Sequence, residues 1–138
     1  MLIAEVAQYL ADNNLGSFQE NGVSGSIFLE CIPETPDEVI GIYSRPGIRG
    51  DLSTTQDVRG FQLIVRGTQN PKSALELAQS LNDLLHGFKN GRFREGGFWI
   101  VACLANQSGP AHIGRDQNGR HEYSLNFTVH LMNDNREV

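Results

Sequence analysis

Apolar residues recur every three or four positions along one segment in the middle of the chain. Asn70-Pro71 supplies a residue suited to the N-cap and a proline suited to the first helical position. Gly87 lies where a helix commonly ends. This spacing predicts an amphipathic helix over residues 71–86. Its apolar stripe consists of Ala74, Leu77, Ala78, Leu81, Leu84, Leu85 and Phe88.

A second, shorter helix is predicted at the start of the sequence. The run Asn13-Asn14-Leu15-Gly16 is typical of the end of a helix. A helix this short is marginal in isolation, so we expect packing against the rest of the chain to hold it. The apolar residues that share one face of it are Leu2, Ile3, Val6, Tyr9 and Leu10.

The remaining apolar positions indicate strands. Residues 123–131 alternate strictly, with apolar side chains at odd positions and polar ones at even positions, as in an antiparallel strand with one wet face. Phe61, Leu63 and Val65 repeat that pattern. Three further runs, residues 26–32, 39–43 and 98–105, are more continuously apolar and predict strands covered on both faces.

These elements follow the order α-β-β-β-α-β-β. The order predicts an α+β fold, in which a mostly antiparallel or mixed sheet of about five strands packs against two helices on one face. The 138 residues fit a single domain, residues 1–138, which is long enough to bury a core without disulfides. Residues 44–60 and 106–119 are rich in Gly, Pro, Ser and Asp and are predicted as loops, and loops this long are usually functional.

Charge is unevenly distributed along the chain. The sequence has 11 basic and 16 acidic residues, a net charge of −5, yet residues 1–40 hold seven carboxylates and no Lys or Arg. Such a separation suits a protein that packs head to tail against copies of itself, although chance in a short segment is the alternative. The absence of a dense Lys/Arg stripe argues against tight DNA binding.

Membrane, secretory and disulfide-rich classes do not fit the sequence. No apolar run approaches the about 20 residues that span a bilayer. The first residues lack the basic region and cleavage site of a secretory signal. Cys31 and Cys103 lie far apart, each within an apolar run, and are predicted to be buried thiols of a cytosolic chain.

Motifs that carry chemistry are also missing. The four histidines have no HExxH spacing, the cysteines form no CxxC pair, and the serine among the glycines of residues 22–26 does not match GxSxG. The sequence contains no phosphate-binding loop motif. We therefore predict no catalytic residue, no cofactor and no metal site.

The most specific segment is the turn Gly114-Arg115-Asp116-Gln117-Asn118-Gly119-Arg120. Asp116 and Asn118 are residue types that hydrogen-bond their own backbone, and Gly119 tolerates a positive φ. Arg115 and Arg120 flank the turn and are expected to pair with Asp116, with Glu122 or with a neighbouring chain.

Several segments in a fixed order carry a resemblance to a known family. They are the helix of residues 1–10, Pro33-Glu34-Thr35-Pro36-Asp37, the strand of residues 60–67, the helix end Leu84-Leu85-His86-Gly87, and the 114–120 turn leading into residues 123–129. Together they cover most of the chain. They resemble the small minor capsid proteins of long-tailed bacteriophages, which are related to the tail-terminator, or tail-to-head joining, proteins.

The resemblance implies a non-enzymatic assembly protein of the virion, present in the host cytoplasm during assembly. Such proteins form a ring, usually a homo-hexamer, on the last ring of the tail tube, where they stop tube polymerisation and dock the DNA-filled head. The implied partners are further copies of the chain, the tail-tube protein and the head-connector protein. No membrane and no sequence-specific nucleic acid is implied, although DNA passes through the ring.

Such a ring needs a head-to-tail interface that closes. We expect the acidic residues 1–40 and the basic remainder of the chain to form its two opposite sides, with Arg115 and Arg120 contributing ion pairs. Residues 44–60 are expected to reach along the tube axis toward the tube protein or the head connector. Two other functions stay open: a head-completion or neck adaptor, and a small soluble ligand-binding α+β domain with the loops as a pocket rim. For Arg115 and Arg120 the alternative is that they only brace their own turn. The candidate interface residues are Arg45, Arg49, Asp51, Arg59, Arg115, Asp116, Asn118 and Arg120.

Overall fold

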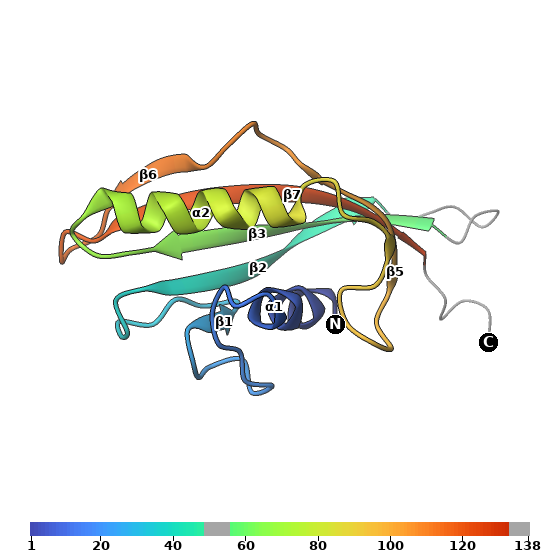
Figure 1. Cartoon of the computed structure of the whole chain (residues 1–138), viewed down its shortest axis with the longest axis horizontal. Helices are drawn as coiled ribbons and strands as arrows, with labels where there is room; N and C mark the ends of the chain where they lie inside the picture. Colours follow the sequence, from blue (N-terminus) through green and yellow to red (C-terminus); the bar gives the residue numbers. More distant parts are fainter. Residues whose placement is uncertain (49–55, 133–138) are drawn as a thin grey trace.

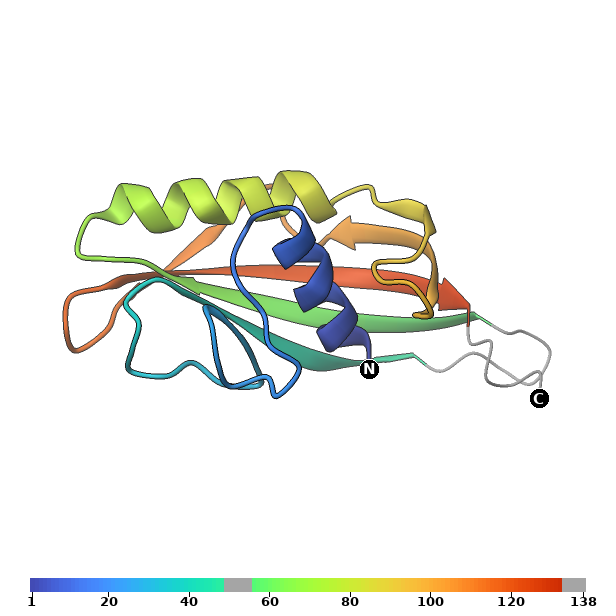
Figure 2. The same ribbon diagram turned by 60° about the horizontal axis from the view of Figure 1, so that its bottom comes forward.

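The computed structural model describes residues 1–48 and 56–132, which form two helices and a seven-stranded sheet. Both helices lie on the same face of the sheet (Figures 1 and 2). The predicted α+β class is confirmed, with seven strands in place of about five. The elements are α1 (Leu2–Asp12), β1 (Ile27–Leu29), β2 (Val39–Ile48), β3 (Gln56–Arg66), α2 (Pro71–Leu85), β4 (Lys89–Gly91), β5 (Trp99–Ala105), β6 (Ala111–Arg115) and β7 (His121–Met132).

The long strands β3 and β7 form the centre of the sheet. The strand order is β1-β2-β3-β7-β5-β4, and β6 also pairs with β7. β1 is parallel to β2, and the other pairs are antiparallel. One edge of β7 pairs with β3 over its whole length, whereas its other edge is shared between β5, which pairs with residues 127–132, and β6, which pairs with residues 121–124.

The core lies between the sheet and the helices. The alternation in β3 and β7 turns Phe61, Leu63, Leu125 and Phe127 inward, where each is at most 1% exposed, and the rings of Phe61 and Phe127 stack with centroids 5.0 Å apart. Apolar residues of both helices join the same cluster. Each such side chain contributes about 1.5–3 kcal/mol by leaving water. The opposite face of the sheet carries partly exposed, mostly polar side chains.

Both predicted helices are confirmed, nearly at the predicted bounds. The Oδ1 of Asn70 accepts a hydrogen bond from the backbone N–H of Lys72 at 3.0 Å, which caps α2, and Pro71 is its first residue. In α1 the buried Glu5 accepts a hydrogen bond from the backbone N–H of Phe98 at 2.8 Å. That bond ties the helix to the segment entering β5, so packing and one buried polar contact hold this short helix.

The first predicted loop, residues 44–60, is largely strand. β2 continues to Ile48 and β3 begins at Gln56, so only residues 49–55 remain, and these lie outside the described residues. Proline is tolerated at position 46 because β1 pairs only with residues 40–42 of β2 and the ladder with β3 is irregular between Arg45 and Ile48. A Cβ on Gly47 would collide with the Val58 carbonyl oxygen, so only glycine fits this close approach.

The second predicted loop, residues 106–119, contains β6, and β4 was also unpredicted. Both strands are short, mostly exposed and poor in apolar residues, so pairing with a neighbouring strand creates them and no apolar pattern reveals them. The prediction that residues 98–105 are covered on both faces is wrong, because Leu104 is 43% exposed on the open face. The prediction holds for residues 39–42, which are buried on both faces.

Candidate functional site

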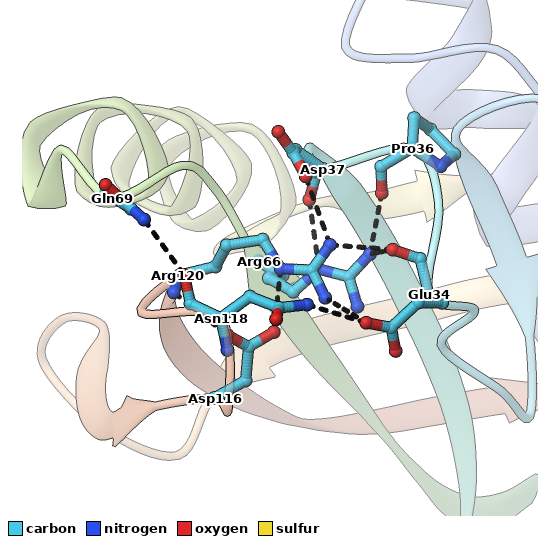
Figure 3. A network of polar contacts seen from close by, with 8 residues as sticks. All are labelled: Glu34, Pro36, Asp37, Arg66, Gln69, Asp116, Asn118 and Arg120. Atoms are coloured by element: carbon cyan, nitrogen blue, oxygen red, sulfur yellow. Dashed lines mark hydrogen bonds and ion pairs between the residues drawn. The ribbon is translucent and has the colours of Figure 1, made fainter.

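A polar cluster joins three distant segments where β3 ends and β7 begins. We call it the arginine corner: Arg66, Arg120, the segment of residues 33–37 and the turn of residues 116–119, with Gln69 beside them (Figure 3). Arg66 is the last residue of β3, and Arg120 immediately precedes β7. Both guanidinium groups point toward the 33–37 segment.

Arg66 holds the backbone of that segment. Its Nε donates to the carbonyl oxygen of Asp37 at 3.0 Å. Its Nη2 donates to the carbonyl oxygens of Pro36 at 2.6 Å and Glu34 at 3.3 Å. Arg66 is 3% exposed, so these contacts satisfy a buried cation whose planar fork fits several carbonyl groups at once.

Arg120 binds both the segment and the turn. Its Nη1 donates to the Glu34 carbonyl oxygen at 2.6 Å and to Asp37 Oδ1 at 3.1 Å, and its Nη2 lies 3.3 Å from Glu34 Oε1. Its Nε donates to Asp116 Oδ2 at 2.7 Å. The Arg120 side chain is 6% exposed, whereas those of Glu34 and Asp37 are 77% and 65% exposed. The cation is therefore inside, and two of its three carboxylate partners lie at the surface.

The turn has the self-bonded form that its sequence predicts. Asp116 Oδ1 accepts from the backbone N–H groups of Asn118 and Arg120, each at 2.9 Å, and Gly119 has φ of 76°. Asn118 reaches across to Glu34 Oε1 at 2.7 Å, and its carbonyl oxygen accepts from Gln69 Nε2 at 3.1 Å. The turn is thus fixed to the 33–37 segment and to the entry of α2.

Electrostatics favour the charged forms of the pair that closes the turn. Desolvation alone raises the pKa of Asp116, but hydrogen bonds from the Arg120 backbone and guanidinium and from the Asn118 backbone outweigh it, so the pKa is lowered. Desolvation alone lowers the pKa of Arg120, but its bonds to Asp116 and Asp37 outweigh it and raise the pKa. Burial, followed by repulsion from Arg120, lowers the pKa of Arg66.

The structure brings some predicted interface residues together and separates others. Asp116, Asn118 and Arg120 belong to the arginine corner, whereas Arg115 is exposed on β6 next to it. Arg45 is exposed on β2 and donates to Gln62. Arg59 lies over the Phe98 ring at 4.9 Å and near Asp57 at 3.7 Å. Arg49 and Asp51 lie outside the described residues.

The uneven charge along the sequence is used within the chain. Glu34 and Asp37 of the acidic first part pair with Arg120, and Glu20 pairs with Arg94 at 2.6 Å. Folding therefore brings acidic and basic segments together without a second copy. Arg66, which reads from the sequence as an ordinary polar position at the end of a strand, was missed. Two features of the sequence together could have indicated Arg66. It lies on the polar side of a predicted strand, and the acidic residues 1–40 contain no Lys or Arg to pair with.

Cysteine and histidine are the other residue types here that often carry chemistry. Burial raises the pKa of Cys103 to about 12, so its thiol is protonated at neutral pH, and both cysteines are free. His86 Nδ1 accepts a hydrogen bond from the Ala105 N–H at 2.9 Å. Within residues 1–48 and 56–132, no group of three or more His, Cys, Asp or Glu is placed to hold a metal ion. No helix of this described part is long and apolar enough to cross a membrane.

In this α+β fold the arginine corner fixes distant segments of one chain to one another through polar side chains. The family model of bacteriophage tail terminator proteins matches residues 9–133, so the chain belongs to this family of structural phage proteins. No curated protein sequence matches the chain. A solved chain described as "Virion of native gene transfer agent (GTA) particle" has a similar fold, with a TM-score of 0.69, 18% identity, and coverage of 95% of this chain and 94% of that one.

Proposed function

We propose that this protein forms a homo-hexameric ring on the last ring of the tail tube, stops tube polymerisation and presents the surface that receives the DNA-filled head. Membership of the tail terminator family over residues 9–133 is the observation that carries the proposal. The likeness in fold to a chain of a gene transfer agent virion supports a place in the finished particle. The protein acts from the host cytoplasm during assembly, without catalysis and without a cofactor.

The arginine corner supplies the rigid part of such a ring. Residues 33–37 and the 116–119 turn are parts of the chain without regular structure, and buried guanidinium groups hold them in one arrangement. A surface that is already ordered loses less entropy on association than a flexible one. We infer that this corner contacts the next copy in the ring.

Exposed groups around the corner carry the contact itself. Arg115 is exposed on β6, and Asn118 is exposed on the turn. Arg120 acts differently, because its guanidinium is engaged by Glu34, Asp37 and Asp116 of the same chain. Arg115 therefore touches the neighbour, as does the exposed side of Asn118, although the Nδ2 of Asn118 is bound to Glu34. The buried Arg120 positions the surface from inside. Arg45 and Arg59, near the other end of the central strands, suit contacts with the tube protein or the head connector.

The net charge of −5 fits passage of DNA through the ring. Carboxylates facing the lumen repel the phosphate backbone, so DNA slides without sticking. Sequence-specific contacts would oppose that movement.

Electron microscopy of phage lacking this protein tests the proposal. Lysates of a deletion phage and of the same phage complemented in trans are compared by negative stain. The expected result is tails of uncontrolled length that are not attached to filled heads, reversed by complementation. Tails of normal length beside empty or leaking heads would assign the protein to the head side of the joint, as a head-completion or neck adaptor. Ordinary infectious particles would remove it from assembly.

A further inference from the structure

Two histidines outside the arginine corner meet across β6 and β7. His112 Nε2 and His121 Nδ1 are 3.0 Å apart, and the ring centroids are separated by 5.2 Å. His112 is exposed and His121 is half-buried, so solvent and ions reach the pair. The proposed ring function makes no use of these residues. They are nine positions apart in the sequence, and only the pairing of β6 with β7 brings them together.

Backbone pairing holds the strands that carry the two histidines. His121 donates its N–H to the Thr68 carbonyl oxygen at 3.1 Å and accepts at its own carbonyl oxygen from Gly67 at 3.0 Å. His112 is in register with Tyr123, whose buried ring lies 5.0 Å from the His112 ring. Since Tyr123 is two residues beyond His121 on the same strand face, the two histidines are diagonal neighbours of one face.

The two nitrogens are joined by a hydrogen bond, and their separation is also one that a single chelated ion can span. Imidazole nitrogens bind Zn²⁺ at about 2.0–2.1 Å, which places two of them about 2.9 Å apart at a right angle and about 3.4 Å apart at a tetrahedral angle. The observed 3.0 Å lies within this interval. In the metal-free chain one of the two nitrogens donates a proton to the other, and a bound ion would take the place of that proton.

We propose that His112 Nε2 and His121 Nδ1 together bind one divalent transition-metal ion of the Zn²⁺, Ni²⁺ or Cu²⁺ type. Imidazole suits these ions, whereas Mg²⁺ and Ca²⁺ prefer oxygen ligands. Each ring then carries its proton on the nitrogen that faces away from the ion, and water fills the remaining positions. Arg115 is in register with His121, so its positive charge opposes the ion and keeps the affinity moderate.

Titration of the full-length chain with Zn²⁺ at neutral pH, by calorimetry, tests the site. We expect one ion per chain in the wild type and binding weaker by about tenfold or more in His112→Ala and in His121→Ala, because each removes one of two ligands. His130→Ala is the matched control. His130 lies nine residues beyond His121 on β7, about 30 Å away, so its loss leaves binding unchanged.

Two further measurements separate binding from folding. Thermal melting without metal establishes that each variant is folded, and added Zn²⁺ raises the melting temperature of the wild type and of His130→Ala alone. The electron paramagnetic resonance spectrum of bound Cu²⁺ shows two nitrogen ligands in the wild type and one in either single variant. Equal affinity in all four proteins, no saturable binding, or a single nitrogen ligand in the wild type would overturn the proposal.

Discussion

The apolar core and the arginine corner join distant parts of the chain by different means. In the core, side chains of both helices and of the central strands meet through shape and exclusion from water. In the corner, two guanidinium groups hold residues 34–37 and 116–120 through directed hydrogen bonds. A core position accepts any apolar group of suitable volume, whereas a corner position requires a donor fork at one place. The core therefore sets overall stability, and the corner sets local geometry.

The largest effect is expected from the core. Phe127→Ala removes a ring that is 1% exposed and stacks on Phe61, so we expect a loss of about 3–5 kcal/mol in the free energy of unfolding. Urea unfolding followed by circular dichroism measures it. His130→Ala, on the open face of the same strand, is the control and should change stability by no more than about 0.5 kcal/mol. A smaller loss for Phe127→Ala than for substitutions in the corner would reverse the ranking.

A smaller but more local effect is expected from Arg66→Met. The change keeps an apolar stem but leaves the carbonyl oxygens of Pro36 and Asp37 without their donor, which costs about 1–3 kcal/mol. Amide hydrogen exchange should increase at Glu34, Thr35 and Asp37, the residues of the 33–37 segment that carry an amide hydrogen, and stay unchanged in α2. Arg66→Lys is the matched variant, because it keeps the positive charge but loses the planar guanidinium group. Its free energy of unfolding should lie between that of Arg66→Met and that of the wild type. Faster exchange throughout the chain would instead show that Arg66 contributes to global stability and not only to the local geometry of the corner.

The same contrast explains what the sequence could predict. The two helices and the alternating strands follow from periodic apolar residues such as Leu81 and Phe127, whose period is a local property. The arginine corner has no period: its partners lie up to 86 positions apart, and their meeting depends on the register of β3 and β7. Strands β4 and β6 escaped prediction for a related reason, because an exposed edge strand is defined by its neighbour. The 116–119 turn was predictable because its bonds are local.

Low pH should weaken the ion pair between Asp116 and Arg120 in the arginine corner without acting directly on the apolar core. The pKa of Asp116 is lowered in the folded state, so its contribution to stability is complete above the ordinary aspartate value of about 3.9 and is lost as the pH falls through the lower folded value. Asp116→Asn removes this titration. We therefore expect the stability difference between wild type and Asp116→Asn to shrink as the pH is lowered below about 4. Urea unfolding at a series of pH values measures it, and a constant difference would contradict the assignment.

The smallest effect on folding is expected at Arg115, where the effect on assembly should be greatest. Its side chain is exposed, so Arg115→Glu should alter the free energy of unfolding by no more than about 0.5 kcal/mol. The reversed charge should nevertheless abolish ring formation, because repulsion replaces attraction at each proposed contact between copies. Sedimentation and electron microscopy of purified protein under conditions in which the wild type forms rings measure the change. Arg115→Lys is the matched control and should still assemble. Full rings from Arg115→Glu would show that Arg115 is not part of the interface and that the arginine corner only braces its own chain. A double replacement of Arg115 and Arg120 would not distinguish the two outcomes, because the loss of Arg120 also removes the hydrogen bonds that hold the corner together.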